Sequence, residues 1–92
     1  MYFVYILKCS DNSFYTGFTL DLDRRLSEHK SKHGANYTRT RLPVVLVYHE
    51  VFDSESEARQ REKQIKGWTR RKKQALIDSD KKLLIEFSKN NT

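Results

Sequence analysis

The sequence predicts an α+β fold, with a three-stranded, mostly antiparallel sheet flanked by helices in the order β-β-α-β-α-α-α. Two runs, residues 2–9 and 44–52, are apolar at nearly every position, as in strands that are covered on both faces. The remaining segments have helix caps and apolar residues at helical spacing. A chain of 92 residues has room for one modest core, so we expect a single domain over residues 1–92.

The N-terminal stretch predicts a β-hairpin with strands over residues 2–9 and 14–18. Tyr5 lies on the first strand and Tyr15 on the second. A two-residue turn at Asp11-Asn12 pairs positions that sum to 23 and places the two phenols on opposite faces. A three-residue loop or a bulge makes the sum 24 and places them on the same face. The residues alone leave both registers open, and core packing is an alternative role for both tyrosines.

The segment after the hairpin predicts a helix over residues 20–33, followed by a loop over residues 35–43. Thr19 or Asp21 is its N-cap, and Gly34 ends it. The third strand, residues 44–52, follows the loop.

Three helices are expected after the third strand. A Ser54-x-x-Glu57 capping box begins one that ends near Lys66. Thr69 caps a second helix over residues 70–77. A last helix begins at Asp80 and buries Leu83, Leu84 and Phe87.

The charge balance favours a polyanionic partner. Eighteen Lys and Arg against twelve Asp and Glu leave a net charge of +6 and a pI near 9.6, which indicates nucleic acid first and a membrane surface second. A single cysteine, Cys9, suits a reducing compartment. There is no signal-peptide pattern and no apolar stretch of the roughly 20 residues that span a bilayer. We therefore expect a cytoplasmic monomer.

Polar side chains accompany the apolar stripe of the first helix. Leu22 and Leu26 define its buried side, and Arg25 and His29 lie four residues apart on one flank of it. An arginine that extends to solvent beside a surface histidine is the alternative to a functional pair.

A carboxylate interrupts the inward stripe of the later helix. Ala58, Glu62 and Ile65 have core spacing, and a carboxylate there needs an ionic partner or a cation. An ion pair to Arg25 or Arg61 and metal ligation are both open. Eight basic side chains surround Glu62: Arg59, Arg61, Lys63, Lys66, Arg70, Arg71, Lys72 and Lys73.

The sequence motifs of several common metal, nucleotide and catalytic sites are absent from the chain. His29 and His33 have i, i+4 spacing, but the H-E-x-x-H zinc pattern is absent and no cysteine is near them. The glycine-rich P-loop, the dinucleotide fingerprint and the G-x-S-x-G elbow are also absent.

Five positions of the chain, in order, resemble the GIY-YIG endonuclease superfamily. FVY (residues 3–5) stands where that family has G-I-Y, and YTG (residues 15–17) where it has Y-I-G. The family's arginine, histidine and glutamate are matched by Arg25, His29 and Glu62. The resemblance runs over residues 2–77, and GANYTRTRLPVVLVY with EKQIKGWTRRKK is similar to the small stand-alone bacterial branch.

The resemblance implies a GIY-YIG-like fold and hydrolysis of DNA phosphodiesters, of branched or single-stranded form. It implies that Glu62 holds one divalent metal ion, Mg²⁺ or Mn²⁺, and that Arg25 binds the phosphate oxygens. Tyr15 or Tyr5 takes the proton of water once Arg25 and the cation lower its pKa, and His29 assists or orients a tyrosine. The residues expected to bind DNA phosphates are Arg39, Arg41, Arg59, Arg61, Lys63, Lys66, Arg70 and Arg71.

Two other functions are open. The chain has Phe3 in place of the family's first glycine, Phe18 where many members have lysine, and no counterpart of a late asparagine. These differences favour a non-catalytic nucleic-acid-binding module that keeps the fold. A protein-interaction domain of a repair or translation complex is the third hypothesis.

Overall fold

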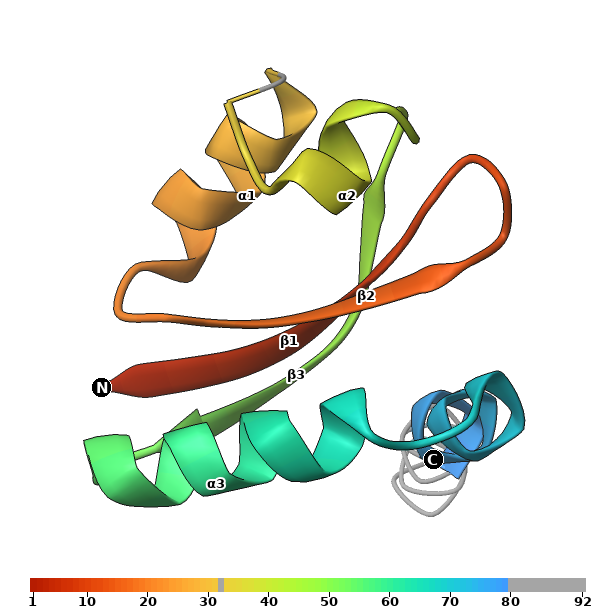
Figure 1. Cartoon of the computed structure of the whole chain (residues 1–92). Coiled ribbons are helices and arrows are strands. Elements are labelled where there is room, and N and C mark those ends of the chain that lie inside the picture. Colours follow the sequence, from red (N-terminus) through yellow and green to blue (C-terminus); the bar gives the residue numbers. More distant parts are fainter. Residues whose placement is uncertain (32, 80–92) are drawn as a thin grey trace, which may run out of the picture.

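The structure, a computed structural model, describes residues 1–31 and 33–79 (Figure 1). Residues 70–79 are also helical, and the helix expected from Asp80 lies outside the described residues. No described helix is long and apolar enough to cross a membrane. The elements, in chain order, are β1 (Tyr2–Lys8), β2 (Phe14–Thr19), α1 (Leu22–Lys30), α2 (Asn36–Arg39), β3 (Val45–Phe52) and α3 (Glu55–Lys66).

The three strands form one antiparallel sheet, as the sequence predicts, and their order in it is β2-β1-β3. β1 is the central strand, and its residues Val4 to Leu7 are all buried because both of its faces are covered. β2 and β3 are the two edges. Among the described residues, the outer edge of β2 has no neighbouring strand, and the candidate site lies along it.

Helices cover both faces of the sheet (Figure 1). Val4 and Ile6 pack with Ala58 and Ile65 of α3 and with Ile77 of the following helix. On the other face, a second cluster forms below α1, and its members are Tyr5, Leu7, Cys9, Val44, Tyr15, Leu22, Leu26, Leu42 and Leu46. Leu22 and Leu26 thus face inward as predicted, and Cys9 is buried and free.

The hairpin register differs from both values that the sequence left open. Leu7 pairs with Tyr15 and Tyr5 with Gly17, so paired positions sum to 22. The Cys9 N–H bonds to the Ser13 carbonyl and Asn12 has φ of 68°, which gives a three-residue loop that ends in a left-handed residue. The loop lies one position earlier than the three-residue loop considered from the sequence. The sum of paired positions is even in both cases, 22 and 24, so the same side chains share a face. Tyr5 and Tyr15 therefore face the same side of the sheet.

Two local predictions between the hairpin and β3 need correction. α1 ends at Lys30 rather than at Gly34, because the Ser31 hydroxyl and the His33 N–H bond to the Glu28 carbonyl and turn the chain. The predicted loop contains α2, which is too short to show an apolar period in the sequence. The expected N-caps Asp21, Ser54 and Thr69 are all present and accept backbone N–H groups.

A charged pair fixes α3 to β3. The Glu50 carboxylate accepts two hydrogen bonds from Arg61, Nε to Oε1 and Nη2 to Oε2, each 2.9 Å long. The Tyr48 hydroxyl also donates to Glu50. Burial raises the pKa of Glu50, but the bonds from Arg61 and Tyr48 outweigh it and hold that pKa below its usual value. The Arg61 guanidinium also lies 5.1 Å from the centre of the Trp68 ring, which extends this contact beyond the end of α3.

Replacement of Glu50 by Gln should lower the free energy of unfolding by about 2 kcal/mol, because it leaves the half-buried Arg61 without its anion. Urea unfolding followed by circular dichroism measures the change. Glu55→Gln is the matched control, since the pair of Glu55 with Arg59 is solvent-exposed and should contribute at most about 0.5 kcal/mol. Equal losses in the two variants would contradict this account.

Candidate active site

The Tyr5 ring lies directly across the hairpin from Gly17. The two residues are paired between β1 and β2, and Tyr5 is 1% exposed. A Cβ atom on Gly17 would overlap Cζ and the hydroxyl oxygen of Tyr5. Glycine is therefore required here for space, because any side chain at position 17 would displace the phenol.

A directed chain of hydrogen bonds runs inward from the Tyr5 hydroxyl. Tyr5 lies 2.9 Å from Nε2 of His29, and Nδ1 of His29 lies 2.7 Å from the Thr38 hydroxyl oxygen. Thr38 donates its only hydroxyl proton to the Ala35 carbonyl, so it accepts from His29. His29 thus carries its proton on Nδ1, and its Nε2 accepts from Tyr5.

Burial sets the protonation of this pair. It raises the pKa of Tyr5 to about 12, although the neighbouring Arg25 opposes the rise. Burial, and then the positive charge of Arg25, lowers the pKa of His29 to about 4. Tyr5 is therefore a neutral donor and His29 a neutral acceptor near pH 7. Desolvation is thus a larger effect on the Tyr5 pKa than the charge of Arg25.

Tyr15 lies in an aromatic cluster around the same position. Its ring centre is 5.2 Å from that of His29 and 6.4 Å from that of Tyr5. Tyr37 of α2 stacks on it with centroids 6.1 Å apart, and Arg41 covers the other face of Tyr37 at 3.9 Å. Sequence reasoning did not select Tyr37, and its only signal was an isolated aromatic in a polar loop.

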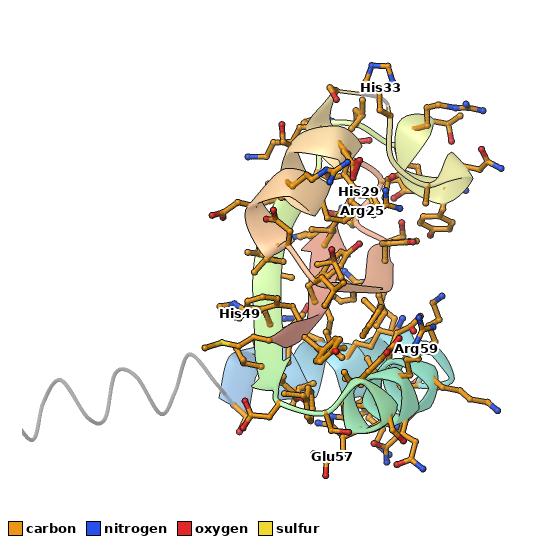
Figure 2. The ribbon with its side chains drawn as sticks, turned by 90° about the vertical axis from the view of Figure 1, so that its left-hand side faces the viewer. Arg25, His29, His33, His49, Glu57 and Arg59 are labelled. Atoms are coloured by element: carbon orange, nitrogen blue, oxygen red, sulfur yellow. The ribbon has the colours of Figure 1, made fainter. Side chains whose placement is uncertain are left out.

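α1 positions Arg25 and His29 together, as their spacing predicts (Figure 2). Arg25 is half-buried, contacts Glu28 at 3.4 Å, and acts electrostatically on both Tyr5 and Tyr15. His33 and His49 lie away from this centre (Figure 2). The two phenols therefore share one cation.

Glu62 approaches the centre from α3, on the other side of the sheet. Its side chain is 19% exposed and forms an ion pair with Lys66 at 2.9 Å, not with Arg25 or Arg61 as the sequence suggested. The negative charge of Glu62 raises the pKa of Tyr5, and Lys66 is in turn affected by Tyr15. Groups from both faces of the sheet thus meet at the free edge of β2.

The donor set at this edge fits one kind of metal site. Among the described residues, no three His, Cys, Asp or Glu side chains are grouped to hold a metal ion. A lone half-buried carboxylate suits a hard cation such as Mg²⁺, which keeps several waters and takes the rest of its ligands from substrate phosphate. It does not suit zinc, which needs several nitrogen or sulfur ligands.

Only some of the arginines and lysines expected to bind DNA phosphates lie beside β2. Arg59 covers the Phe18 ring at 4.6 Å, and Arg70 covers Phe14 at 4.9 Å while it donates to the Asn12 carbonyl. Both therefore flank β2. Arg61 is held by Glu50 and does not belong with them. The remaining residues, apart from Lys66, are Arg41, which pairs with Asp11, and the exposed Arg39, Lys63 and Arg71.

Comparison with known proteins agrees with this arrangement. The model of the GIY-YIG catalytic domain matches residues 1–75. The chain belongs to the GIY-YIG family. A UPF0213 protein of Haloquadratum walsbyi is 53% identical over 77 residues, which cover 84% of this chain and 86% of that protein. A UPF0213 protein of Staphylococcus haemolyticus is 51% identical over 77 residues, which cover 84% and 94%.

Solved structures agree on the fold of this GIY-YIG domain. The solution structure of a UPF0213 protein from Bacillus halodurans is 48% identical, with a TM-score of 0.56, and the match covers 85% of this chain and 84% of that one. A protein from E. faecalis is 40% identical with a TM-score of 0.59, over 85% and 83% of the two chains. The α+β, GIY-YIG-like fold predicted from the sequence is confirmed.

Replacement of Gly17 by Ala should lower the free energy of unfolding by about 1–3 kcal/mol, because the new methyl group pushes the Tyr5 ring away from His29. Urea unfolding measures the loss, and NMR spectra of the His29 ring report the changed hydrogen bond. Gly67→Ala is the control, since a Cβ there meets only ordinary contacts, the nearest at 3.5 Å. An unchanged His29 spectrum in Gly17→Ala would contradict the proposed contact.

The low pKa of His29 should make stability depend on pH. Between about 6.5 and about 4, the unfolded chain binds a proton that the folded chain excludes. The free energy of unfolding should therefore fall as pH drops through this window, by up to ~3 kcal/mol. Urea unfolding at a series of pH values should show a flatter fall in His29→Gln but not in the exposed His49→Gln. The same slope in wild type and His29→Gln would refute this assignment.

Proposed function

We propose that the protein is a metal-dependent endonuclease that hydrolyses phosphodiester bonds in DNA. The observation that carries this proposal is the meeting of two phenols, one guanidinium and one carboxylate at the free edge of β2. Hydrolysis of a phosphodiester needs a base for water and positive charge on the phosphate, and these groups supply both. The basic residues along β2 supply attraction for a polyanion.

The environments of the two tyrosines assign them different roles. The Tyr5 hydroxyl donates a hydrogen bond to His29, and its pKa is raised. Tyr5 therefore stays a neutral phenol that positions water or phosphate. Tyr15 is only partly buried and lines the hollow at the free edge of β2 together with Lys66, so water can reach its hydroxyl. Tyr15 is therefore the better candidate for the base that takes the proton of the attacking water.

Arg25 and His29 support the two phenols. The planar guanidinium of Arg25 is suited to two non-bridging phosphate oxygens at once, where it balances the charge that develops as water attacks phosphorus. His29 is fully buried and orients Tyr5, so it is a positioning residue. The water oxygen forms the new bond to phosphorus as the bond from phosphorus to one ester oxygen breaks. Tyr15, in its ionised phenolate form, takes the proton of the water, and the leaving oxygen takes a proton from solvent.

Glu62 is the residue that would hold the metal ion, Mg²⁺ or Mn²⁺. When bound, such an ion neutralises phosphate charge and eases departure of the ester oxygen. Lys66 forms an ion pair with Glu62 at 2.9 Å, and a bound cation would compete with it for the same carboxylate.

The substrate we propose is DNA, in branched or single-stranded form, bound by a monomer with little sequence preference. Contacts from arginine and lysine to phosphates position a strand without reading its bases. The presence of Phe18, without the family's lysine, favours a second function, a nucleic-acid-binding module without catalysis.

Cleavage of end-labelled single-stranded, duplex, flapped and four-way-junction DNA tests the proposal, with Mg²⁺, Mn²⁺ or chelator. Wild type should cut only with metal. Glu62→Gln and Tyr15→Phe should each lose at least about 10²-fold in rate, as expected for the loss of a charge-stabilising group or a base. Glu57→Gln is the matched control on α3, because Glu57 points away from the sheet (Figure 2).

Each other outcome has one meaning. Salt-sensitive binding of DNA without cutting would favour the binding module. Cutting at equal rates by wild type and Glu62→Gln would refute the assignment of Glu62. A loss in Glu57→Gln as large as in Glu62→Gln would show that the effect is a general one of charge on α3.

A further inference from the structure

A hollow of about 260 Å³ lies beside the site, at the outer edge of β2. Its lining includes Tyr15, which is stacked on Tyr37, and two lysines, one at the end of α3 and one on the helix that follows. By liquid volume this is room for roughly eight water molecules, enough for a phosphate group with part of its sugar. The residues that line the hollow are Phe14, Tyr15, Thr16, Tyr37, Lys66 and Lys73.

Lys73 is the unusual residue in this hollow. It is only 9% exposed, whereas lysines are rarely buried unless they are paired. Within residues 1–31 and 33–79, no carboxylate lies within ion-pair distance of its ammonium group. Burial, and then the like charge of Lys66, lowers the pKa of Lys73. The two lysines line one hollow and only Lys66 has a carboxylate partner among the described residues, Glu62, so an anion in the hollow would balance the charge of Lys73.

Thr16 adds a neutral donor to the same hollow. It is 2% exposed, and its hydroxyl is the only buried side-chain polar atom in the described part of the chain without a hydrogen-bond partner. A buried group left without a partner costs about 1–3 kcal/mol. Because Cys9 bonds to Ser13 at the end of the hairpin, alternate pairing points the Thr16 N–H away from β1, to the free edge.

The same edge carries further positive charge on either side of the hollow. Arg70 lies over Phe14 and Arg59 over Phe18, the two residues that flank Thr16 at a spacing of two along β2. Side chains two apart on a strand share a face, so both arginines lie over the face of β2 that carries Thr16. Their positive charge adds to the attraction for a polyanion.

We propose that Lys66, Lys73 and Thr16 form a binding site for a backbone phosphate of DNA, one that neighbours the phosphate to be cleaved at Tyr15. The site deepens the proposed function, because it rests on DNA as the ligand and identifies how its strand is held. The strand crosses the free edge of β2, with one phosphate in the hollow that Tyr15 and the two lysines line. Ammonium groups with a hydroxyl and a backbone N–H suit the several oxygens of a phosphate.

The test compares Lys73→Met with Lys72→Met. Both remove one charge from adjacent positions, but Lys72 is exposed and lies over the Trp68 ring at 4.4 Å, outside the hollow. Binding to single-stranded DNA is measured by fluorescence anisotropy in chelator, over a range of salt concentrations. Lys73→Met should reduce the slope of log affinity against log salt by about 0.7, the value for one phosphate contact on a single strand. Lys72→Met should change it much less.

Two further variants separate the site from effects on folding. Thr16→Val should be as stable as wild type or more stable, because it removes an unsatisfied hydroxyl, and yet it should bind DNA more weakly. Thr16→Ser should restore the binding. Inorganic phosphate should shift the NMR signal of the Thr16 amide in wild type and in Lys73→Arg, but not in Lys73→Met. Equal slopes for Lys73→Met and Lys72→Met would overturn the proposal, as would an unmoved Thr16 amide.

Failure of the site and failure of the nuclease are distinguishable. A reduced slope in Lys73→Met, together with no cutting by wild type in any metal, would support the phosphate site and refute the proposed endonuclease activity. Metal-dependent cutting by wild type, together with equal slopes for Lys73→Met and Lys72→Met, would refute the phosphate site and support the endonuclease activity. Displacement of DNA by an acidic peptide as readily as by an oligonucleotide of equal charge would overturn the assignment to phosphate.

Discussion

The contact between the Tyr5 ring and the backbone of Gly17 is the constraint on which the site depends. The ring occupies the space of a missing side chain on the paired strand, so its hydroxyl reaches across Gly17 to the buried imidazole of His29. His29 then fixes that hydroxyl from α1, and Thr38 fixes His29 from α2. Gly34 allows this last arrangement, because a Cβ there would overlap the imidazole. Two glycines thus make room for the two rings that must meet.

The position of β2 at the edge of the sheet explains how two layers contribute to one site. A sheet separates the groups on its two faces, and only at a free edge do side chains from both sides approach each other. α1 brings Arg25 and His29 over one face, and α3 brings Glu62 and Lys66 past the other. An uncovered edge strand invites unwanted pairing with other strands, and flanking cations such as Arg59 and Arg70 oppose it. The same cations give the edge its attraction for phosphate.

Much of the fold follows from the sequence because each element has a local signal. Apolar runs gave the strands, and the caps at Asp21, Ser54 and Thr69 gave the helix starts. The hairpin register depended on where a three-residue loop closes, which a left-handed Asn12 decides and composition does not. The spacing of Arg25 and His29 placed them on one flank. The partner of Glu62 could not be foreseen, because Arg61 was taken by Glu50 across the chain and left Lys66 as the cation within reach. Tyr37 was missed because its role comes only from stacking on Tyr15.

Lys66 connects the carboxylate to the hollow. It forms an ion pair with Glu62, lines the hollow with Lys73, and responds to the charge of Tyr15. A cation bound at Glu62 would compete with Lys66 for the same carboxylate, since both need its negative charge. Loss of that partner would leave the charge of Lys66 uncompensated beside the hollow, which would strengthen the attraction of the hollow for phosphate. By the reciprocity of linked equilibria, phosphate in the hollow would draw Lys66 away and free Glu62 for the cation. The shared lysine would therefore make binding at the two proposed sites mutually favourable, as the proposed function requires.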